Sequence, residues 1–248
     1  MCTVSIIARK QGYALGMNRD EQLTRVCALP PAKNIINGCT VLSPSEPGGG
    51  TWIAVNDSGV AFALINWYSI TRRVKGQTVS RGQVVTAASG AKTPDLADAA
   101  LAQLPLKRIN PFRLVGIFPA SGEIVEWRWD LKRLFTKQHP WKDQQWISSG
   151  FDEPVARRIR SRTFREALKQ KSAGGLGWLR RLHRSHVPVR GAFSTCMHRN
   201  DAITVSYTEI VVAPSRATMR YHRGAPCRAL KHSSRQLRLQ KATLVASR

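Results

Sequence analysis

The chain repeats one local pattern, in which two short segments rich in β-branched and aromatic residues are joined by a turn that contains glycine or asparagine. The paired segments are 3–9 with 13–17, 51–56 with 60–66, 112–118 with 123–129, and 193–198 with 203–212. Segments of this composition, joined by such turns, are typical of antiparallel β-hairpins. The pattern therefore predicts a fold built around antiparallel sheets.

Two segments carry helical signals. Thr93 followed by Pro94 is typical of a helix N-cap with proline at the first helical position, and an alanine-rich stretch follows. A second helical pattern runs over residues 153–171. Antiparallel hairpins with grouped helices predict the α+β class, with helices covering the faces of the sheets. A chain of 248 residues can form one large domain or two small ones.

The chain is strongly basic, because 39 lysines and arginines stand against 15 acidic residues and give a net charge of +24. Such a balance favours association with anions such as nucleic acid, anionic lipid, or acidic small molecules that include nucleotides and coenzyme A. Nucleic acid is the least favoured of these partners, because the aromatic residues do not form an RNA-binding signature.

The C-terminal end is free of acidic residues after Glu209, and residues 228–248 carry six lysines and arginines with little apolar periodicity. We therefore expect one domain over residues 1–212 and a solvated basic tail over 213–248. The alternative is a tail that binds phosphates or weakly binds nucleic acid or an anionic membrane. Residues 173–189 contain three glycines and a basic run, which predicts a loop or an insertion.

No apolar stretch approaches the length of a membrane span, and the apolar run 4–8 is too short for a signal peptide and is followed, not preceded, by positive charge. These features predict a cytoplasmic protein. The five cysteines are Cys2, Cys27, Cys39, Cys196 and Cys227. Their odd number and the absence of a C-x-x-C pair argue against a disulfide framework and against a zinc site.

The second residue, Cys2, stands directly after the initiator methionine. A residue this small allows the cell's aminopeptidase to remove Met1, which would leave Cys2 with a free α-amino group beside its thiol. One strand and one turn later, the chain carries a polar cluster at 18–21. A three-residue hairpin turn would place Asp20 opposite Cys2, whereas a two-residue loop would place Arg19 there. Directly opposed residues have Cβ atoms about 4.5–5.5 Å apart, so either register brings the cluster to Cys2.

Cys2 with its own α-amine would combine a nucleophile and a base on one residue. An α-amine has a pKa of about 7.7–8.0, which suits a general base near neutral pH. It would take the thiol proton before the sulfur attacks an acyl carbon. Arg19 would lower the pKa of the thiol, and Asp20 would hold the α-ammonium or Arg19. The competing interpretation is structural, with Cys2 as a small buried residue and the cluster as a turn with a surface ion pair.

The second hairpin offers a candidate oxyanion hole. A three-residue turn at 57–59 would place Asn66 opposite Gly50, in the run of glycines at 48–50. A side-chain amide beside glycines with accessible N–H groups could stabilise a developing oxyanion. Trp67 and Tyr68 follow directly and would give an apolar substrate a surface to contact.

These residues together resemble the NRDE family, also called the transport and Golgi organisation protein 2 family. The matching stretches occur in order at 1–2, 18–21, 49–54 and 63–67, with similar later blocks at 80–82 and 204–206, and the similarity covers about residues 1–212. The resemblance implies an αββα four-layer sandwich of antiparallel sheets, of the N-terminal nucleophile hydrolase type, related to choloylglycine hydrolases and penicillin V acylases. In those relatives the N-terminal cysteine attacks a non-peptide amide.

The resemblance also implies roles for individual residues. The expected catalytic residues are Cys2, Arg19, Asp20 and Asn66, and the expected substrate-binding residues are Asn18, Glu21, Gly49, Gly50, Trp52 and Trp67. No cofactor and no metal are expected. Two departures stand out: the relatives carry Arg-x-x-Asp where this chain has adjacent Arg19 and Asp20, and the family usually has an asparagine where this chain has Ser149.

Other candidate sites carry weaker signals. His183 and His186 are three residues apart, which suits a metal on a helix, but they lie in a basic run that repels cations. Given the resemblance, His222 and Cys227 are candidate ligands for haem iron. The many cations of 153–171 indicate a solvated helix face, or a dock for a phosphate or carboxylate tail such as that of coenzyme A.

Two functions are therefore expected on one fold. The first is a cysteine N-terminal nucleophile hydrolase that cleaves an amide or thioester bond of a small acyl or anionic substrate. The second is a binding or trafficking protein for acyl-coenzyme A, lipid or haem, in which Cys2 contacts the ligand without turnover. A basic adaptor that binds nucleic acid or membrane through its tail is the third interpretation.

Overall fold

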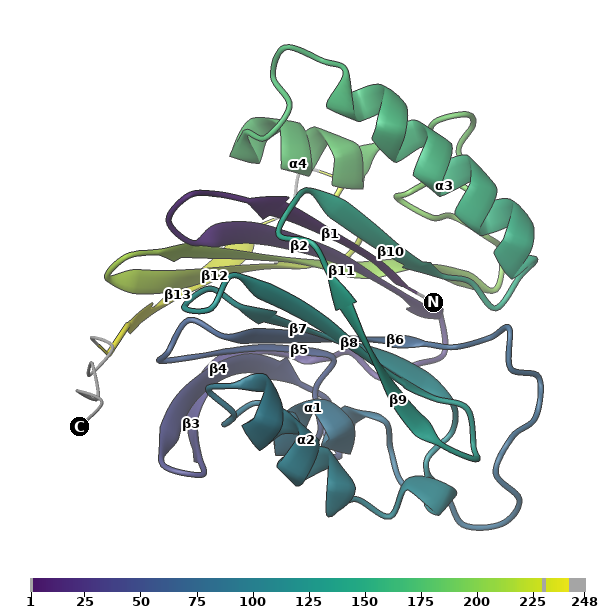
Figure 1. Cartoon of the computed structure of the whole chain (residues 1–248). Coiled ribbons are helices and arrows are strands. Elements are labelled where there is room, and N and C mark those ends of the chain that lie inside the picture. The colour runs from purple at the N-terminus through teal and green to yellow at the C-terminus, as the bar shows by residue number, and fades with distance from the viewer. Residues whose placement is uncertain (1, 229–230, 241–248) are drawn as a thin grey trace.

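The computed structural model describes residues 2–228 and 231–240, which form two stacked antiparallel sheets (Figure 1). The six-stranded sheet contains, in spatial order, β10 (Gln144–Ser148), β1 (Cys2–Ala8), β2 (Tyr13–Gln22), β11 (Ala202–Ala213), β12 (Arg216–Arg223) and β13 (His232–Arg238). The seven-stranded sheet contains β3 (Leu29–Ile36), β4 (Cys39–Ser45), β5 (Ile53–Asn56), β6 (Ala61–Asn66), β7 (Phe112–Phe118), β8 (Glu123–Trp129) and β9 (Leu134–His139). The two sheets confirm the expected antiparallel architecture.

Helices lie on the outer face of each sheet (Figure 1). The six-stranded sheet is covered by α3 (Glu153–Leu168) and α4 (Leu176–Arg184), and the seven-stranded sheet by α1 (Gly82–Ala88) and α2 (Pro94–Ala102). A short 3-10 helix, Leu106–Arg108, precedes β7. In the part of the chain that the structure describes, no helix has the length and apolar character needed to cross a lipid bilayer.

The inner strands of each sheet are buried on both faces and are therefore apolar on both sides. In β2, Leu15 and Met17 face the core between the sheets, whereas Ala14 packs with Trp178 and Leu182 of α4. In β6, Ala63 faces the inter-sheet core and Phe62 packs against α1 and α2. This double burial explains the continuous hydrophobic runs of these strands, since neither face meets water.

Three of the predicted hairpins are present. β1 pairs with β2 in the register of a two-residue loop, with Ala8 opposite Tyr13, and this decides between the two alternatives. β5 pairs with β6 in the expected register, with Ile53 opposite Ala63. β7 and β8 have the predicted bounds. The composition of the segments and their turn residues were sufficient to predict these three hairpins, because each hairpin pairs two strands that are neighbours in sequence.

The fourth predicted hairpin is wrong. Residues 193–198 do not form a strand, and a single bridge joins His198 to Ile203. β11 instead pairs with β2 and β12. Side chains hold the 193–198 segment in place of a ladder: Arg160 donates to the carbonyl of Phe193 over 3.4 Å, and Asn18 donates to the carbonyl of Thr195 over 2.8 Å.

The expected basic tail over 213–248 is corrected by β12 and β13, which extend the six-stranded sheet to Arg238. Arg216 and Arg220 of β12 alternate with Ala217, Met219 and Tyr221, which are buried in the inter-sheet core. High charge concealed this period-two pattern, because the alternation places the charges on the opposite face of the strand. The last part of the expected tail, 241–248, lies outside the described residues.

The helix predictions are confirmed for α2, and α3 lies within the predicted 153–171. Thr93 caps α2 by accepting from the N–H of Leu96, as its position before Pro94 predicts. The expected loop at 173–189 contains helix α4 instead. Trp178, Leu179 and Leu182 are buried on one face of α4, so packing against the six-stranded sheet stabilises a helix that its glycine-rich start disguised.

A charged cluster is buried between the sheets. The carboxylate of Glu126 receives hydrogen bonds from Arg113 over 2.5 Å, Arg128 over 2.7 Å and His139 over 2.8 Å. Burial alone would raise the pKa of Glu126, but the hydrogen bonds from His139 and Arg128 and the charge of Arg113 hold it well below its usual range. Arg113 also donates to the carbonyl of Ile147 over 3.4 Å, which ties the seven-stranded sheet to β10.

Candidate active site around Cys2

A polar cavity of about 540 Å³ opens at the start of β1 and contains Cys2 in its wall. Its lining comes from both sheets and from the loop before α1: Cys2, Arg19, Asp20, Glu21, Gln22, Arg25, Glu46, Thr51, Trp52, Leu64, Asn66, Tyr68, Thr78, Val79, Ser80, Arg81, Gly82 and Asn110. Six residues expected from the sequence lie here, namely Cys2, Arg19, Asp20, Glu21, Trp52 and Asn66. The other four, Asn18, Gly49, Gly50 and Trp67, are not part of the lining.

Strand pairing places Cys2 between two polar neighbours. It lies opposite Arg19 in β2 and opposite Ser148 in β10. Directly opposed residues project to the same face of a sheet, so all three side chains face the seven-stranded sheet, and Cys2 and Arg19 line the cavity. Ser148 is buried, and its hydroxyl has no hydrogen-bond partner among the described residues.

Arg19 is held in a fixed position within the cavity wall. Its guanidinium forms ion pairs with Glu46 and, over 3.4 Å, with Glu21. It also lies 4.5 Å from the ring centroid of Trp52, a cation–π distance. Arg25 pairs with the second oxygen of Glu46 over 2.6 Å. These partners hold the cation beside Cys2.

The environment of Cys2 acts on its thiol in two directions. Burial and the negative charge of Asp20 raise the pKa of the thiol, whereas the positive charge of Arg19 and a hydrogen bond from the N–H of Asp20 lower it. Burial is the larger effect, so the pKa of the thiol is raised overall. The charge of Arg19 therefore does not offset the effect of burial on the pKa of the thiol.

Asp20 is among the lining residues of the cavity, and its buried carboxylate pairs with a cation from α3. Arg160 donates to Asp20 Oδ2 over 3.3 Å and to the hydroxyl of Thr3 over 2.9 Å, and its side chain is 0% exposed. Thr204 donates to Asp20 Oδ1 over 2.6 Å. Arg160 belongs to the set of cations that the sequence assigned to a solvated or docking face. The one sequence signal that distinguishes Arg160 from the other cations of α3 is its helical spacing, which places it on the buried face of the helix with Ala156 and Phe164.

Asn66 ends β6 at the opposite wall of the cavity. Its Nδ2 donates to the hydroxyl of Tyr68 over 2.9 Å, and both residues line the cavity. Tyr68 packs closely on Gly150, so it connects this wall to the segment that follows β10. An amide carries two N–H donors, and the bond to Tyr68 uses one of them.

The glycine run before β5 forms a tight turn that packs against α1. The N–H of Gly49 donates to the carbonyl of Glu46 over 2.9 Å. Gly50 has φ +82°, and a Cβ placed there would lie 3.1 Å from Gly82. These glycines allow close backbone approach. They do not place a donor in the cavity lining next to Asn66, and Trp67 lies outside it as well, with its ring against Phe135.

Asn18 faces away from the cavity and fastens α4 and the loop after it to β2. Its Nδ2 donates to the carbonyls of His183 and Thr195 over 2.9 and 2.8 Å, and its Oδ1 lies 3.1 Å from His183 Nδ1. Burial and the charge of Arg160 lower the pKa of His183 to about 3, so this histidine is neutral. His183 therefore has a structural role. It is not half of the metal pair that its spacing from His186 suggested.

Arg81, just before α1, is a cavity residue without an ion pair among the described residues. Its guanidinium donates to the carbonyl of Pro111 over 3.4 Å. Burial lowers the pKa of Arg81, yet an arginine stays charged at neutral pH. The sequence placed Arg81 in a family-like block but did not assign it a role. Its unpaired charge in the cavity marks it as a candidate for binding an anion.

Two further expectations concern the surface of α3 and the haem candidates. Arg157, Arg158 and Arg165 line a hollow of about 460 Å³ together with Ser69, Pro154 and Ser161, which is the kind of surface an anionic tail would require. His222 packs between the rings of Tyr207 and His232, whereas Cys227 contacts His198. His222 and Cys227, the two candidate ligands for haem iron, therefore contact different residues and do not contact each other in these interactions.

Ser149 takes part in the turn that starts α3. Its hydroxyl donates to the carbonyl of Phe151 over 2.6 Å, and its N–H donates to Glu153 over 3.4 Å. Because a hydroxyl has a single proton, Ser149 cannot also donate to a substrate while this bond is present.

This chain is similar to one known protein family in sequence and to several solved structures in fold. The model of the family described as Transport and Golgi organisation 2 matches residues 1–128. The curated proteins contain no match.

Among solved structures, the C2A form of a conjugated bile acid hydrolase from Clostridium perfringens is similar, with 10% sequence identity and a TM-score of 0.57. The similarity covers 95% of this chain and 92% of that one. Penicillin V acylase from Agrobacterium tumefaciens has 13% identity and a TM-score of 0.56, over 96% of this chain and 86% of that one. At these identities the likeness shows a shared fold and nothing further.

Proposed function

The chain belongs to the Transport and Golgi organisation 2 family, and from this premise we propose that it is a cysteine N-terminal nucleophile hydrolase that cleaves an amide or thioester bond of a small anionic acyl substrate. The observation that carries the proposal is the position of Cys2 at the start of β1, in the wall of a 540 Å³ cavity, between Arg19 and Ser148. The arrangement of helices and sheets supports its classification as the αββα sandwich of such hydrolases.

The nucleophile of this mechanism is formed by removal of Met1. The free α-amine of Cys2 then takes the proton of its own thiol, and the sulfur attacks the acyl carbon of the substrate. The thiol needs this base because burial raises its pKa. Arg19 supplies positive charge next to the sulfur and is itself held by Glu46 and Trp52.

The carbonyl oxygen of the substrate becomes an oxyanion as the carbon–sulfur bond forms. Asn66 would stabilise it with the amide N–H that Tyr68 does not use. Collapse of the intermediate breaks the bond to the leaving amine or thiol, which takes the proton from the α-ammonium. Water, deprotonated by the α-amine, then attacks the acyl–cysteine, releases the acid and restores the thiol.

Asp20 would orient the α-amine, and Arg160 holds the Asp20 carboxylate in place. The carboxylate is buried at the end of β2 and is held by Arg160 and Thr204 from two other elements. A buried carboxylate next to the amine stabilises the α-ammonium that forms when the thiol loses its proton. In this scheme Arg160 and Thr204 are positioning residues, because they act through Asp20.

A thiol-labelling experiment tests the nucleophile directly. We expect the intact mass to show that Met1 is absent, and iodoacetamide at neutral pH to label Cys2 faster than the exposed Cys27. A variant with one leucine inserted between Met1 and Cys2 keeps its methionine and serves as the matched control. Without a free α-amine, its buried Cys2 should react only as the pH is raised, because its thiol pKa stays above the ordinary value.

If the mature protein retains Met1, or if Cys2 reacts no faster than in the leucine variant, the base is missing and the hydrolase proposal fails. The binding interpretation then takes its place, and one observation favours it. The hydroxyl of Ser149 is occupied by Phe151, so a second side-chain donor for the oxyanion is lacking at this position. That function requires stoichiometric binding of an acyl ligand without turnover.

The charge of the substrate can be tested through Arg81. We expect Arg81→Gln to raise the KM for an N-acyl amino acid about tenfold to a hundredfold, because a charge-assisted hydrogen bond contributes about 1.5–3 kcal/mol. The KM for the corresponding neutral N-acyl amino amide should change little, and kcat should be nearly unchanged for both. Arg72→Gln, an exposed cation on the same loop, is the control. Equal effects on both substrates would show that Arg81 does not recognise the carboxylate.

A further inference from the structure

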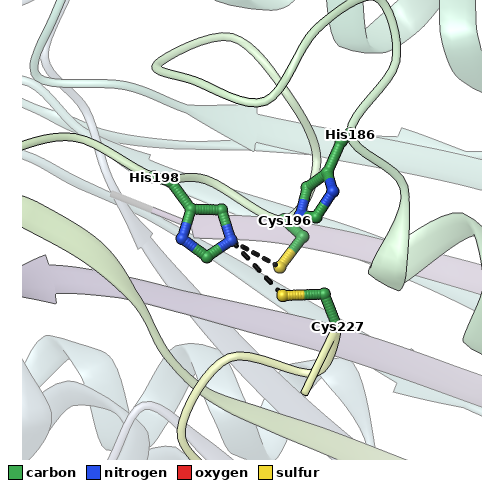
Figure 2. Close-up of side chains that lie close together, drawn as sticks. All are labelled: His186, Cys196, His198 and Cys227. Atoms are coloured by element: carbon green, nitrogen blue, oxygen red, sulfur yellow. Dashed lines mark hydrogen bonds between the residues drawn. The ribbon is translucent and has the colours of Figure 1, made fainter.

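Two loops outside the Cys2 cavity bring together two histidines and two cysteines. His186, Cys196 and His198 lie in the segment between α4 and β11, and Cys227 lies in the connection between β12 and β13 (Figure 2). One ligand atom from each residue can be chosen so that all four lie within 4.8 Å of one another. The side chains converge on one point from loops that are distant in sequence.

Two separations between ligand atoms match those of a tetrahedral metal site. Zn–S bonds of about 2.3 Å and Zn–N bonds of about 2.0–2.1 Å place S and N atoms of neighbouring ligands about 3.5 Å apart around a tetrahedron. The Nε2 of His198 lies 3.5 Å from Cys196 Sγ and 3.4 Å from Cys227 Sγ. The remaining ligand atoms lie within 4.8 Å of one another, so side-chain shifts of up to about 1 Å would complete the coordination sphere.

The ligand atoms have few other partners. His186 Nε2 is buried and has no hydrogen-bond partner among the described residues, an arrangement that costs free energy unless something binds there. The two sulfurs contact His198. Arg190 donates weakly to His198 Nδ1 over 3.4 Å, and this exposed side chain can turn to solvent when Nδ1 carries the proton that a metal-bound imidazole requires.

The charge balance also permits a cation in this basic region. Repulsion by the basic run was an argument against metal binding at His183 and His186. Here the donor set is different, because two cysteine thiolates would cancel the charge of a divalent ion and leave a neutral site. Soft sulfur combined with imidazole nitrogen in a tetrahedral S₂N₂ set favours zinc over magnesium or calcium.

We propose that His186, Cys196, His198 and Cys227 bind one zinc ion in a structural site. The ion would fasten the connection between β12 and β13 to the segment between α4 and β11. The absence of a C-x-x-C pair concealed this site, because its ligands come from two loops and its two cysteines are separated by the whole of β11 and β12.

The proposed zinc site is connected to the Cys2 cavity through Arg160 and Asp20. The segment that carries three of the ligands also supplies the carbonyls of Ala192 and Phe193 to Arg160, and the carbonyl of Thr195 to Asn18. Arg160 in turn holds Asp20. A zinc ion would therefore stabilise the loop against which the buried end of the active site is built.

The test begins with the zinc content of full-length protein produced with zinc and dialysed without chelator. We expect about one equivalent per chain, and at least about tenfold less in Cys227→Ser and His186→Ala. Cys27→Ser and His232→Ala, which alter an exposed cysteine and an exposed histidine outside the cluster, should keep the metal. Cobalt in place of zinc should give the visible bands of a tetrahedral site and a thiolate charge-transfer band that Cys227→Ser removes.

Chelation provides a second readout. Removing the metal should lower the melting temperature of the wild type and leave that of Cys227→Ser unchanged, because the apo variant has no ion to lose. The proposal is overturned if folded wild-type protein holds no more zinc than Cys227→Ser. It is also overturned if Cys196 and Cys227 form a disulfide in the purified protein and reduction does not restore zinc binding. Neither result bears on whether Cys2 acts as a nucleophile.

Discussion

Replacing Cys2 by alanine is expected to abolish hydrolysis while the protein remains folded. The sulfur forms the bond to the acyl carbon, so its removal should lower kcat at least about a thousandfold. Alanine fits the site because Cys2 is a small residue packed in the inter-sheet core at the start of β1. The measurement is turnover of N-acyl amino acids and of N-acetylcysteamine thioesters, with the melting temperature as the check on folding.

The matched control is Cys27→Ser, which changes an exposed cysteine and should leave turnover unchanged. A second readout is the intact mass after a brief exposure to thioester substrate. Wild-type protein should gain one acyl group at Cys2, and Cys2→Ala should gain none. Full activity in a folded Cys2→Ala protein would rule out the nucleophile and, with it, the mechanism proposed above.

Replacing Arg160 by methionine is expected to affect stability and activity together. The side chain is completely buried and pairs with Asp20, whose side chain is also 0% exposed. Breaking a buried ion pair from one side leaves an uncompensated charge, so the free energy of unfolding should fall by about 3–5 kcal/mol. Arg162→Met, on the exposed face of α3, should change it by no more than about 0.5 kcal/mol. Urea denaturation measures both values.

The double variant Arg160→Met with Asp20→Asn separates the two effects. Neutralising Asp20 removes the unpaired charge, so the double variant should recover part of the lost stability. It should not recover turnover, because no carboxylate then remains to orient the α-amine of Cys2. Recovery of both properties would show that Asp20 and Arg160 serve the fold alone.

The fold was predictable where its determinants are local. The hairpins β1–β2, β5–β6 and β7–β8 follow from alternating apolar residues and turn residues that are neighbours in sequence, and Thr93 and Pro94 mark the start of α2. α4 and β12 were not predicted. Their apolar residues occur within strongly basic segments, and only packing against other elements turns those weak patterns into stable structure.

The candidate active site also contains some contacts that are set by local sequence and others that are set by tertiary packing. The approach of Cys2 to Arg19, and the end of β6 at Asn66, are consequences of hairpin register, so both were predictable to within one residue of ambiguity in the first turn. By contrast, the contact of Arg160 with Asp20 and the position of Arg81 in the cavity lining depend on how elements distant in sequence pack together. The convergence of His186, Cys196, His198 and Cys227 also depends on this packing. The physical reason is that hairpin pairing is set by a few adjacent residues, whereas these contacts depend on how whole sheets and helices pack, which no short stretch of sequence encodes.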